Sequence, residues 1–160
     1  MVVNLTEVKD AGKLGYLGSI LLFIPFADVA GIVLVTLALR RLSRAYGNNA
    51  IGKNATYALV STIASIGAFS AVFLGINSNV GGLIFAFALL PAVGLLVGGY
   101  WFMTNAYDEL AESSEVNEFN KAAHWYYIGA VLLFFLIGVI FLIIANIYAL
   151  LGFRRLKNMQ

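Results

Sequence analysis

Four long apolar segments divide this chain, and they constrain its fold more than any other feature. They cover residues 14–39, 55–76, 83–104 and 122–153, and nearly all charged residues lie outside them. The chain is 61% hydrophobic and 11% charged, whereas soluble domains have about 45–50% apolar and about 25% charged residues. Because so few charges cannot cover a water-facing surface, we expect an integral membrane protein, folded as one domain over residues 1–160.

The apolar segments are expected to be helices, so the fold class predicted is all-α. Lipid offers no hydrogen-bond partner to the backbone, and no segment alternates as the strands of a membrane barrel do. A crossing helix needs about 20 apolar residues, which fits segments 55–76 and 83–104. Segments 14–39 and 122–153 are long for one crossing and short for two complete ones.

The distribution of basic residues separates two topologies. If each segment crosses once, five of the ten Lys and Arg residues lie on each side of the membrane. If the first and last segments are hairpins, all ten share one side, which the positive-inside rule favours. We therefore predict a bundle of six short transmembrane helices with hairpins at both ends. The alternative is four long transmembrane helices. The protein is expected to be a multi-pass protein of the cell membrane, with its Lys- and Arg-rich face cytoplasmic.

The turn of the first hairpin is predicted within FIPFADVAG, residues 23–31. Pro25 ends a helix there, because its ring clashes with the preceding turn. Asp28 can then cap the next helix by accepting its free amide hydrogens. A carboxylate near the bilayer centre costs about 2.5–3.5 kcal/mol, so we interpret Asp28 as a cap in the headgroup region. The alternative is an intramembrane group that binds a cation or relays a proton.

Small residues on two neighbouring segments predict close helix packing. Gly94 and Gly98 form a G-x-x-x-G pattern. The preceding segment carries a stripe that includes Ser61, Ala64, Ser65 and Ala68. Membrane helices associate through small residues, because lipid tails provide no hydrophobic drive for association. These faces either hold the monomer together or mediate oligomerisation. Pro91 is expected to kink its helix.

Three further polar features have structural interpretations. Asn146 is expected to form a hydrogen bond between helices, with a role in substrate contact as the alternative. His124 adjoins Trp125 and two tyrosines, which is typical of an interfacial aromatic belt. Its alternatives are a haem or quinone contact or a proton switch. The five acids between Asp108 and Glu118 follow helical spacing, which predicts a solvated helix face. They could otherwise dock a partner or bind divalent cations.

No motif for catalysis or cofactor binding is found in the sequence. The chain has no cysteine, one histidine and a net charge of +2. We expect no catalytic residue, no cofactor, no metal site and no nucleic-acid partner, and we predict that the protein is not an enzyme. The expected partners are membrane lipid and a homo-oligomer or larger membrane complex.

Two functions are predicted for such a protein. The first is a structural or accessory subunit that packs through the small-residue faces. The alternative is an oligomeric channel or transporter for a small solute or ion, with Asp28, Asn146 and the break at Pro91 on its path.

Two long stretches of the sequence resemble a known family. They are LGYLGSILLFIPFADVAGIVLVTLALRRLSRAYGNNAIGKNATYAL and, later, FNKAAHWYYIGAVLLFFLIGVIFLIIANIYALLGF. In these stretches the chain resembles the "domain of unknown function 996" family of small, mostly archaeal membrane proteins. The features that carry the resemblance are glycines spaced along helices and an apolar helix that ends in Leu-Arg-Arg-Leu-Ser. The resemblance implies a membrane location and an archaeal source. It brings no activity and no catalytic residues, so it transfers no site.

Overall fold

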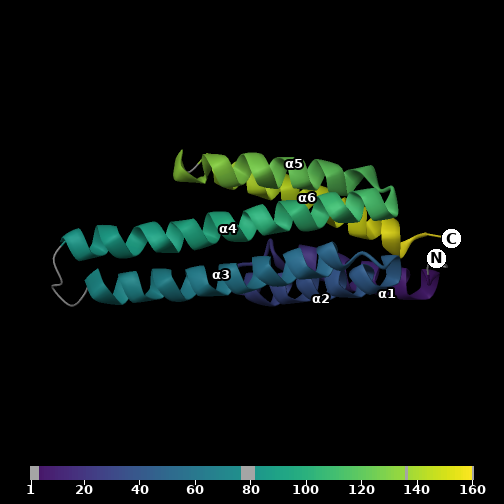
Figure 1. The fold of residues 1–160 in the computed structure, drawn as a ribbon, viewed down its shortest axis with the longest axis horizontal. Helices are drawn as coiled ribbons and strands as arrows, with labels where there is room; N and C mark the ends of the chain where they lie inside the picture. Colours follow the sequence, from purple (N-terminus) through teal and green to yellow (C-terminus); the bar gives the residue numbers. More distant parts are fainter. Residues whose placement is uncertain (1–3, 77–81, 136, 160) are drawn as a thin grey trace.

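The computed structural model describes residues 4–76, 82–135 and 137–159, and these residues form helices joined by short turns (Figure 1). The helices are α1 Leu5–Leu21, α2 Asp28–Tyr46, α3 Asn49–Ile76, α4 Gly82–Ser114, α5 Asn117–Leu132 and α6 Gly138–Lys157, with a 3-10 turn, η1 Leu133–Phe135, after α5. No strand occurs among the described residues. The all-α prediction is confirmed.

The six helices pair into three hairpins, α1–α2, α3–α4 and α5–α6. α2 also packs on α3, α4 on α5 and α6 on α1, so the helices close into a ring. Both termini and the α2–α3 and α4–α5 connections lie at one end, which we call the charged end (Figure 1). The hairpins predicted at both ends of the chain are therefore present, and the alternative of four long helices does not describe the fold.

The hairpins differ in length, which corrects the prediction of six short helices. α3 and α4 have 28 and 33 residues, whereas α1 and α5 have 17 and 16. At 1.5 Å per residue, α3 is about 42 Å long and α1 about 26 Å. Figure 1 shows the α3–α4 hairpin extending well past the tips of the other two. The long helices exceed the apolar segments because each continues into a polar stretch, α3 from Asn49 and α4 as far as Ser114.

Within the described residues, three helices are long and apolar enough to cross a membrane. They cover Asn49–Gly75 in α3, Leu89–Ser114 in α4 and Gly138–Lys157, which is α6. α1 does not qualify, because it has only 17 residues and four of them are charged. The structure therefore supports membrane association without establishing six crossings.

Glycines allow the helices of the short hairpins to touch near the tips. A Cβ on Gly31 would lie 2.8 Å from the carbonyl oxygen of Gly18, and a Cβ on Gly18 would lie 2.9 Å from that of Gly31. In the α5–α6 hairpin, a Cβ on Gly138 would overlap the carbonyl oxygen of Gly129. Any side chain at these contacts forces two backbones apart.

The largest buried side chains lie between the helices towards the charged end. Tyr107 stacks on Phe119 with ring centroids 5.7 Å apart, and Phe153 meets Phe119 edge-on at 5.1 Å. All three side chains are fully buried. Because Phe153 also lies against Gly15 of α1, this aromatic cluster joins the first and last helices of the chain.

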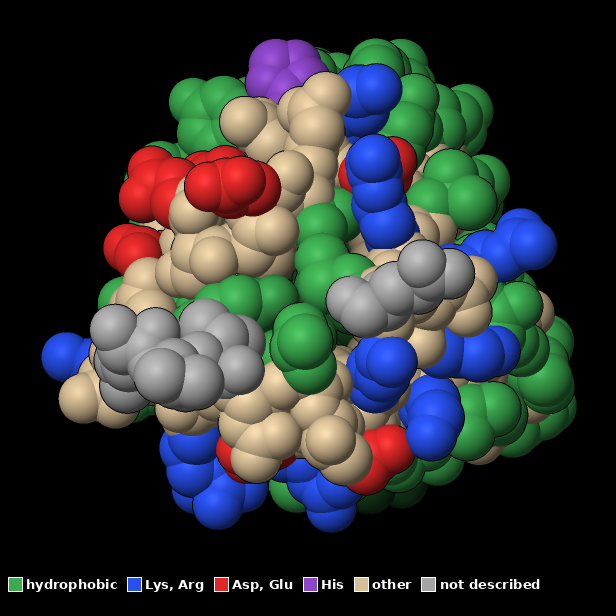
Figure 2. Space-filling view, turned by 90° about the vertical axis from the view of Figure 1, so that its right-hand side faces the viewer, with side chains coloured by type: hydrophobic (Ala, Val, Ile, Leu, Met, Phe, Trp, Pro, Cys, Tyr) green, Lys and Arg blue, Asp and Glu red, His purple; other side chains and the backbone are tan. Residues whose placement is uncertain are grey.

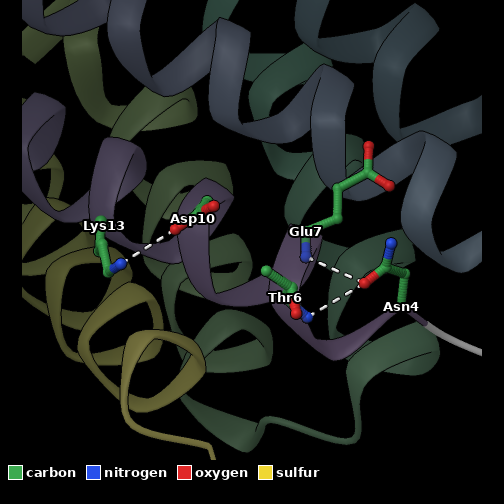
Figure 3. A network of polar contacts seen from close by, with 5 residues as sticks. All are labelled: Asn4, Thr6, Glu7, Asp10 and Lys13. Carbon is green, nitrogen blue, oxygen red and sulfur yellow. Dashed lines mark hydrogen bonds and ion pairs between the residues drawn. The ribbon is translucent and has the colours of Figure 1, made fainter.

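Polar side chains define the helix ends at the charged end. Asn4 caps α1, because its Oδ1 accepts hydrogen bonds from the N–H groups of Thr6 and Glu7 at 3.2 and 3.4 Å (Figure 3). Gly47, with φ of 68°, ends α2. Asn48 then accepts a hydrogen bond from the N–H of Ala50 and starts α3. The connection between α2 and α3 is thus only two residues long, since the chain becomes helical again at Asn49.

Candidate functional site

Asp28 lies at the tip of the α1–α2 hairpin. It is the first residue of α2, and its Oδ1 accepts a hydrogen bond from the N–H of Val29 at 2.9 Å. Ala27 holds the N-cap position and makes no side-chain cap. The turn before it contains Phe26, which has φ of 68° and is 100% exposed. The side chain of Asp28 is also exposed, at the positive end of a helix dipole.

This tip ends partway along the α3–α4 hairpin (Figure 1). Asp28 lies about 18 Å along α2 from Arg40, at 1.5 Å per residue. On the same measure α3 continues for about 35 Å beyond Lys53. The tip therefore reaches only about half as far from the charged end as the long hairpin does.

A cavity of about 60 Å³ lies inside the bundle where the three hairpins meet. It is lined by Leu22, Ile32, Val35, Thr62, Gly99, Tyr100, Met103, Tyr126 and Asn146. Every hairpin contributes to this wall, and four of the side chains are polar and uncharged. A space of this size holds a small number of water molecules.

Two helices of the last hairpin are joined by a hydrogen bond in the cavity wall. The hydroxyl of Tyr126 on α5 donates to Oδ1 of Asn146 on α6. The ring of Tyr126 also stacks on Tyr100 at 5.9 Å and on Tyr107 at 5.5 Å. The rings form a column that leads from the cavity towards the charged end. The Tyr107 hydroxyl is buried and has no hydrogen-bond partner among the described residues.

The cavity can bind neutral polar groups but carries no charge of its own. Its hydroxyls and amide donate and accept hydrogen bonds. Asp28 lies outside the cavity wall, in the hairpin tip between Leu22 and Ile32, which both belong to that wall. The structure thus brings Asn146 and the Asp28 tip to neighbouring levels of the bundle. Among the residues described, no three potential metal ligands gather.

The predicted packing residues divide between an inner and an outer face. Ser61 donates a hydrogen bond to the carbonyl oxygen of Leu95 at 2.7 Å, and a Cβ on Gly98 would lie 3.5 Å from Ser61 Oγ. Ser65 is fully buried and Ala68 is half-buried. These residues lie on the inner face, where α3 packs on α4.

The outer face holds Ala64 and Gly94, both exposed. A Cβ on Gly94 would meet no described atom within 4 Å. Within one chain, Gly94 therefore does not act as the first glycine of a packing motif. The tight approach is made instead by Gly99, where a Cβ would lie 2.8 Å from Thr62 Oγ1.

Other singled-out residues lie on the surface. Pro91 is exposed, and α4 continues through it. His124 is exposed beside Trp125, with ring centroids 5.8 Å apart. The acidic run does not form one helix face, because Glu115, with φ of 57°, lies in the turn between α4 and α5.

Sequence reasoning missed the tyrosines of the cavity and of the ring column. Tyr100, Met103 and Tyr107 are spaced to share one face of α4, and that spacing is the available signal. The tyrosines can equally be assigned to an interfacial aromatic belt, because Trp and Tyr are enriched there. Only the packing of α4 against α5 shows that they face inward.

The fold and the cavity define a class: a bundle of three helical hairpins, with three helices long and apolar enough to span a membrane. Within that class, residues 75–147 match the family described as "Protein of unknown function (DUF996)". The chain is also 28% identical to "Uncharacterized protein MJ1644" of Methanocaldococcus jannaschii, over 95% of this chain and 94% of the relative. No solved structure matches. The predicted family resemblance is confirmed, and the relative is archaeal; neither match names an activity.

Proposed function

We propose that this is a multi-pass membrane protein with a structural or accessory role, exercised by packing against another membrane protein beside its α3–α4 hairpin. In the simplest case that partner is a second copy of the chain. The observation that carries the proposal is the unequal reach of the hairpins. The α3–α4 hairpin carries no charged residue between Lys53 and Asp108 and is long enough to cross the membrane, while the α1–α2 tip ends partway along it.

The membrane boundary on one side is supplied by the charged end. The Lys and Arg residues lie in segments 9–13, 40–53 and 154–157 and at Lys121, all near this end (Figure 2). The hydrocarbon core is about 30 Å thick, close to the reach of α3 beyond Lys53. Such a placement leaves the α1–α2 tip near mid-membrane, which departs from the headgroup position expected for Asp28.

A hairpin tip near mid-membrane must be shielded from the lipid hydrocarbon. Non-helical backbone within the hydrocarbon is tolerated only where protein buries it or water surrounds it. Asp28 and the exposed turn around Phe26 meet neither condition in a single chain surrounded by lipid. Another protein in the space beyond the tip, beside α3 and α4, would remove this cost.

The outer face of α3 suits a helix partner. Ala64, Gly67 and Ala71 recur at positions that share one side of the helix, and all three are exposed. A Cβ on Gly67 would meet no described atom within 4 Å. Small residues allow two helix backbones to approach closely in lipid, so this face can pack against a second helix without rearranging the bundle.

Gly67→Leu tests the proposal. The leucine fills the outer face without touching the described remainder of the chain, so we expect a folded protein whose oligomers are lost. Ile66→Phe, on an exposed position of the same helix that is turned away from Ala64, Gly67 and Ala71, is the matched control and should leave oligomers intact. Native mass spectrometry from lipid nanodiscs measures the copy number. A wild-type protein that is monomeric in every lipid, and captures no other membrane protein when purified from its own membrane, would exclude the role.

A second candidate function is a channel or transporter for a small solute or ion. The cavity between the hairpins and the nearby Asp28 favour it, because intramembrane carboxylates often mark such paths. Asp28→Asn in a liposome flux assay is the test. Absence of flux in the wild type, or equal flux in the variant, removes this candidate.

A further inference from the structure

A basic groove lies between α2 and α3 at the charged end. It has a volume of about 630 Å³. Its lining residues are Leu37, Arg40, Arg41, Ser43, Arg44, Asn49, Gly52, Lys53 and Thr56. No acidic residue is among them. The groove lies apart from the cavity and from the outer face of the long hairpin.

The spacing of the two helices explains the groove. Leu37, Arg40, Arg41 and Arg44 recur at the i, i+3, i+4 and i+7 positions of α2, so they share one side of that helix. Asn49, Gly52, Lys53 and Thr56 repeat this spacing on α3. Gly52 has no side chain, and a Cβ there would lie 2.9 Å from Ser43 Oγ. Close helices form the floor, and long cationic side chains form the rim.

The cations of this groove are not neutralised within the described part of the chain. Ion pairs there join Lys13 to Asp10 and Arg155 to Glu118, and none involves the three arginines of α2. The ammonium group of Lys53 lies over the face of the Tyr57 ring, 5.8 Å from the ring centroid. Arg41 and Arg44 also border a second groove that contains Glu7 and Asp10, whereas Arg40 and Lys53 line the basic groove alone.

The charges on this end are separated. Figure 2 shows most Lys and Arg side chains over the lower and right-hand parts of the charged end, with the largest group of acids at the upper left. Burying or clustering like charges costs free energy unless an anion compensates them. Arg40 and Lys53 line a groove that has no acidic residue, so they are suited to bind an anion from outside the chain.

We propose that the basic groove binds the phosphate headgroup of an anionic phospholipid. Arg40 on α2 and Lys53 on α3 bind the phosphate from opposite walls of the groove. Guanidinium groups bind phosphate oxygens in pairs, whereas the Thr56 hydroxyl already donates to the carbonyl oxygen of Gly52 within α3. Leu37, 42% exposed, continues the wall towards the apolar outer surface. Charge at the rim with apolar surface below it matches a phospholipid rather than a free anion.

The test compares two double variants of the full chain with equal loss of charge. R40Q/K53Q removes the cations that belong to this groove alone. R154Q/K157Q removes two cations at the same end but outside the groove, the exposed Arg154 and the half-buried Lys157. Native mass spectrometry of delipidated protein in detergent, titrated with phosphatidylglycerol or phosphatidylcholine, measures retention. Two basic residues at a membrane surface correspond to about 30-fold in affinity. We expect R40Q/K53Q to lose phosphatidylglycerol binding by about this factor and R154Q/K157Q to leave it unchanged.

Two further experiments test whether charge is sufficient for binding and whether the bound phosphate belongs to a lipid or is free. R40K/K53R keeps both charges and should keep phosphatidylglycerol binding. Inorganic phosphate should fail to displace the lipid at matched concentration. Equal losses in the two double variants, or equal binding of phosphatidylcholine by the wild type, would overturn the site. Displacement by inorganic phosphate would overturn its assignment to lipid.

Discussion

The α1–α2 and α3–α4 hairpins use glycine in opposite ways. In the short hairpin, Gly18 and Gly31 face each other, and the two backbones are in contact. In the long hairpin, Gly67 and Gly94 face outward, where a Cβ would meet no described atom within 4 Å. Glycine content alone therefore does not indicate which helix face is packed. The first pair is needed to fold one chain, whereas the second is available for contact between chains.

Gly31→Leu should have the largest effect on stability. A Cβ at Gly31 lies 2.8 Å from Gly18 O and 2.9 Å from Leu22 N. Both atoms are backbone and cannot move aside, so the hairpin must open. Overpacking of this kind costs about 1–3 kcal/mol, and more where the backbone blocks relaxation. We expect a loss of at least about 3 kcal/mol for leucine, measured by thermal unfolding in detergent.

Gly67→Leu is the matched change on the long hairpin. The free energy of unfolding of the monomer should not fall and should rise by roughly 0.5–1 kcal/mol, because leucine has a higher helix propensity than glycine. If both leucines destabilise the monomer equally, the division between packed and open glycines is wrong.

Gly138→Ala and Gly94→Ala extend the comparison to the α5–α6 hairpin. The alanine at 138 collides with the backbone of Gly129 and Leu132, so we expect a loss of about 1–3 kcal/mol. The alanine at 94 has open space in mid-helix, where it should stabilise by about 0.5–1 kcal/mol through helix propensity. Opposite shifts of the unfolding temperature support the comparison, and shifts of the same sign contradict it.

The order of the helices could be predicted from sequence, but their lengths could not. The positions of the charged residues indicated hairpins at both ends, because that topology places all ten Lys and Arg residues on one side of the membrane. The Gly and Asn residues between positions 47 and 54 are typical of turns and by themselves indicate a loop. In the structure Asn48 caps a helix there, and Gly52 meets Ser43 across the α2–α3 contact. Tertiary packing thus outweighed the low helix propensity of Gly and Asn.

The candidate site was less accessible to sequence reasoning. Asn146 was singled out, but Tyr126 was assigned no partner. Their hydrogen bond depends on how α5 and α6 align, which the Gly129–Gly138 contact and the turn between them set. The depth of Asp28 was also beyond the sequence, because it depends on where α1 begins and on how far the long hairpin extends.

Tyr126→Phe and Tyr107→Phe test the ring column with a smaller effect. Both keep the stacked rings and remove one hydroxyl. At Tyr126 the change leaves Asn146 Oδ1 without its donor, which costs about 1 kcal/mol or more. At Tyr107 the hydroxyl has no partner among the described residues, so its removal should be neutral or stabilising. The difference in unfolding free energy between the two variants is the measurement, and a larger loss for Tyr107→Phe would contradict the hydrogen-bond assignment.

The smallest effect is expected where an ion pair closes the α5–α6 hairpin at the charged end. Both oxygens of Glu118 lie 2.8 Å from Nη1 of Arg155. Burial raises the pKa of the Glu118 carboxyl, but the hydrogen bonds and charge of Arg155 outweigh it, so the pKa is lowered. A lowered pKa in the folded state stabilises the protein above the unfolded pKa, and this contribution is lost as the pH falls through the folded value.

Glu118→Gln should therefore be less stable than the wild type at neutral pH and equal to it at strongly acidic pH. The Arg155 side chain is 61% exposed, and solvent limits such pairs to less than about 1 kcal/mol. Unfolding temperatures measured from neutral to acidic pH give the difference, with Arg154→Gln as a control that loses a charge without breaking this pair. The long hairpin has no charged residue between Lys53 and Asp108, so no acid-dependent loss of this kind can arise along that stretch. A gap that persists unchanged at low pH would show that Glu118 contributes through packing rather than through its charge.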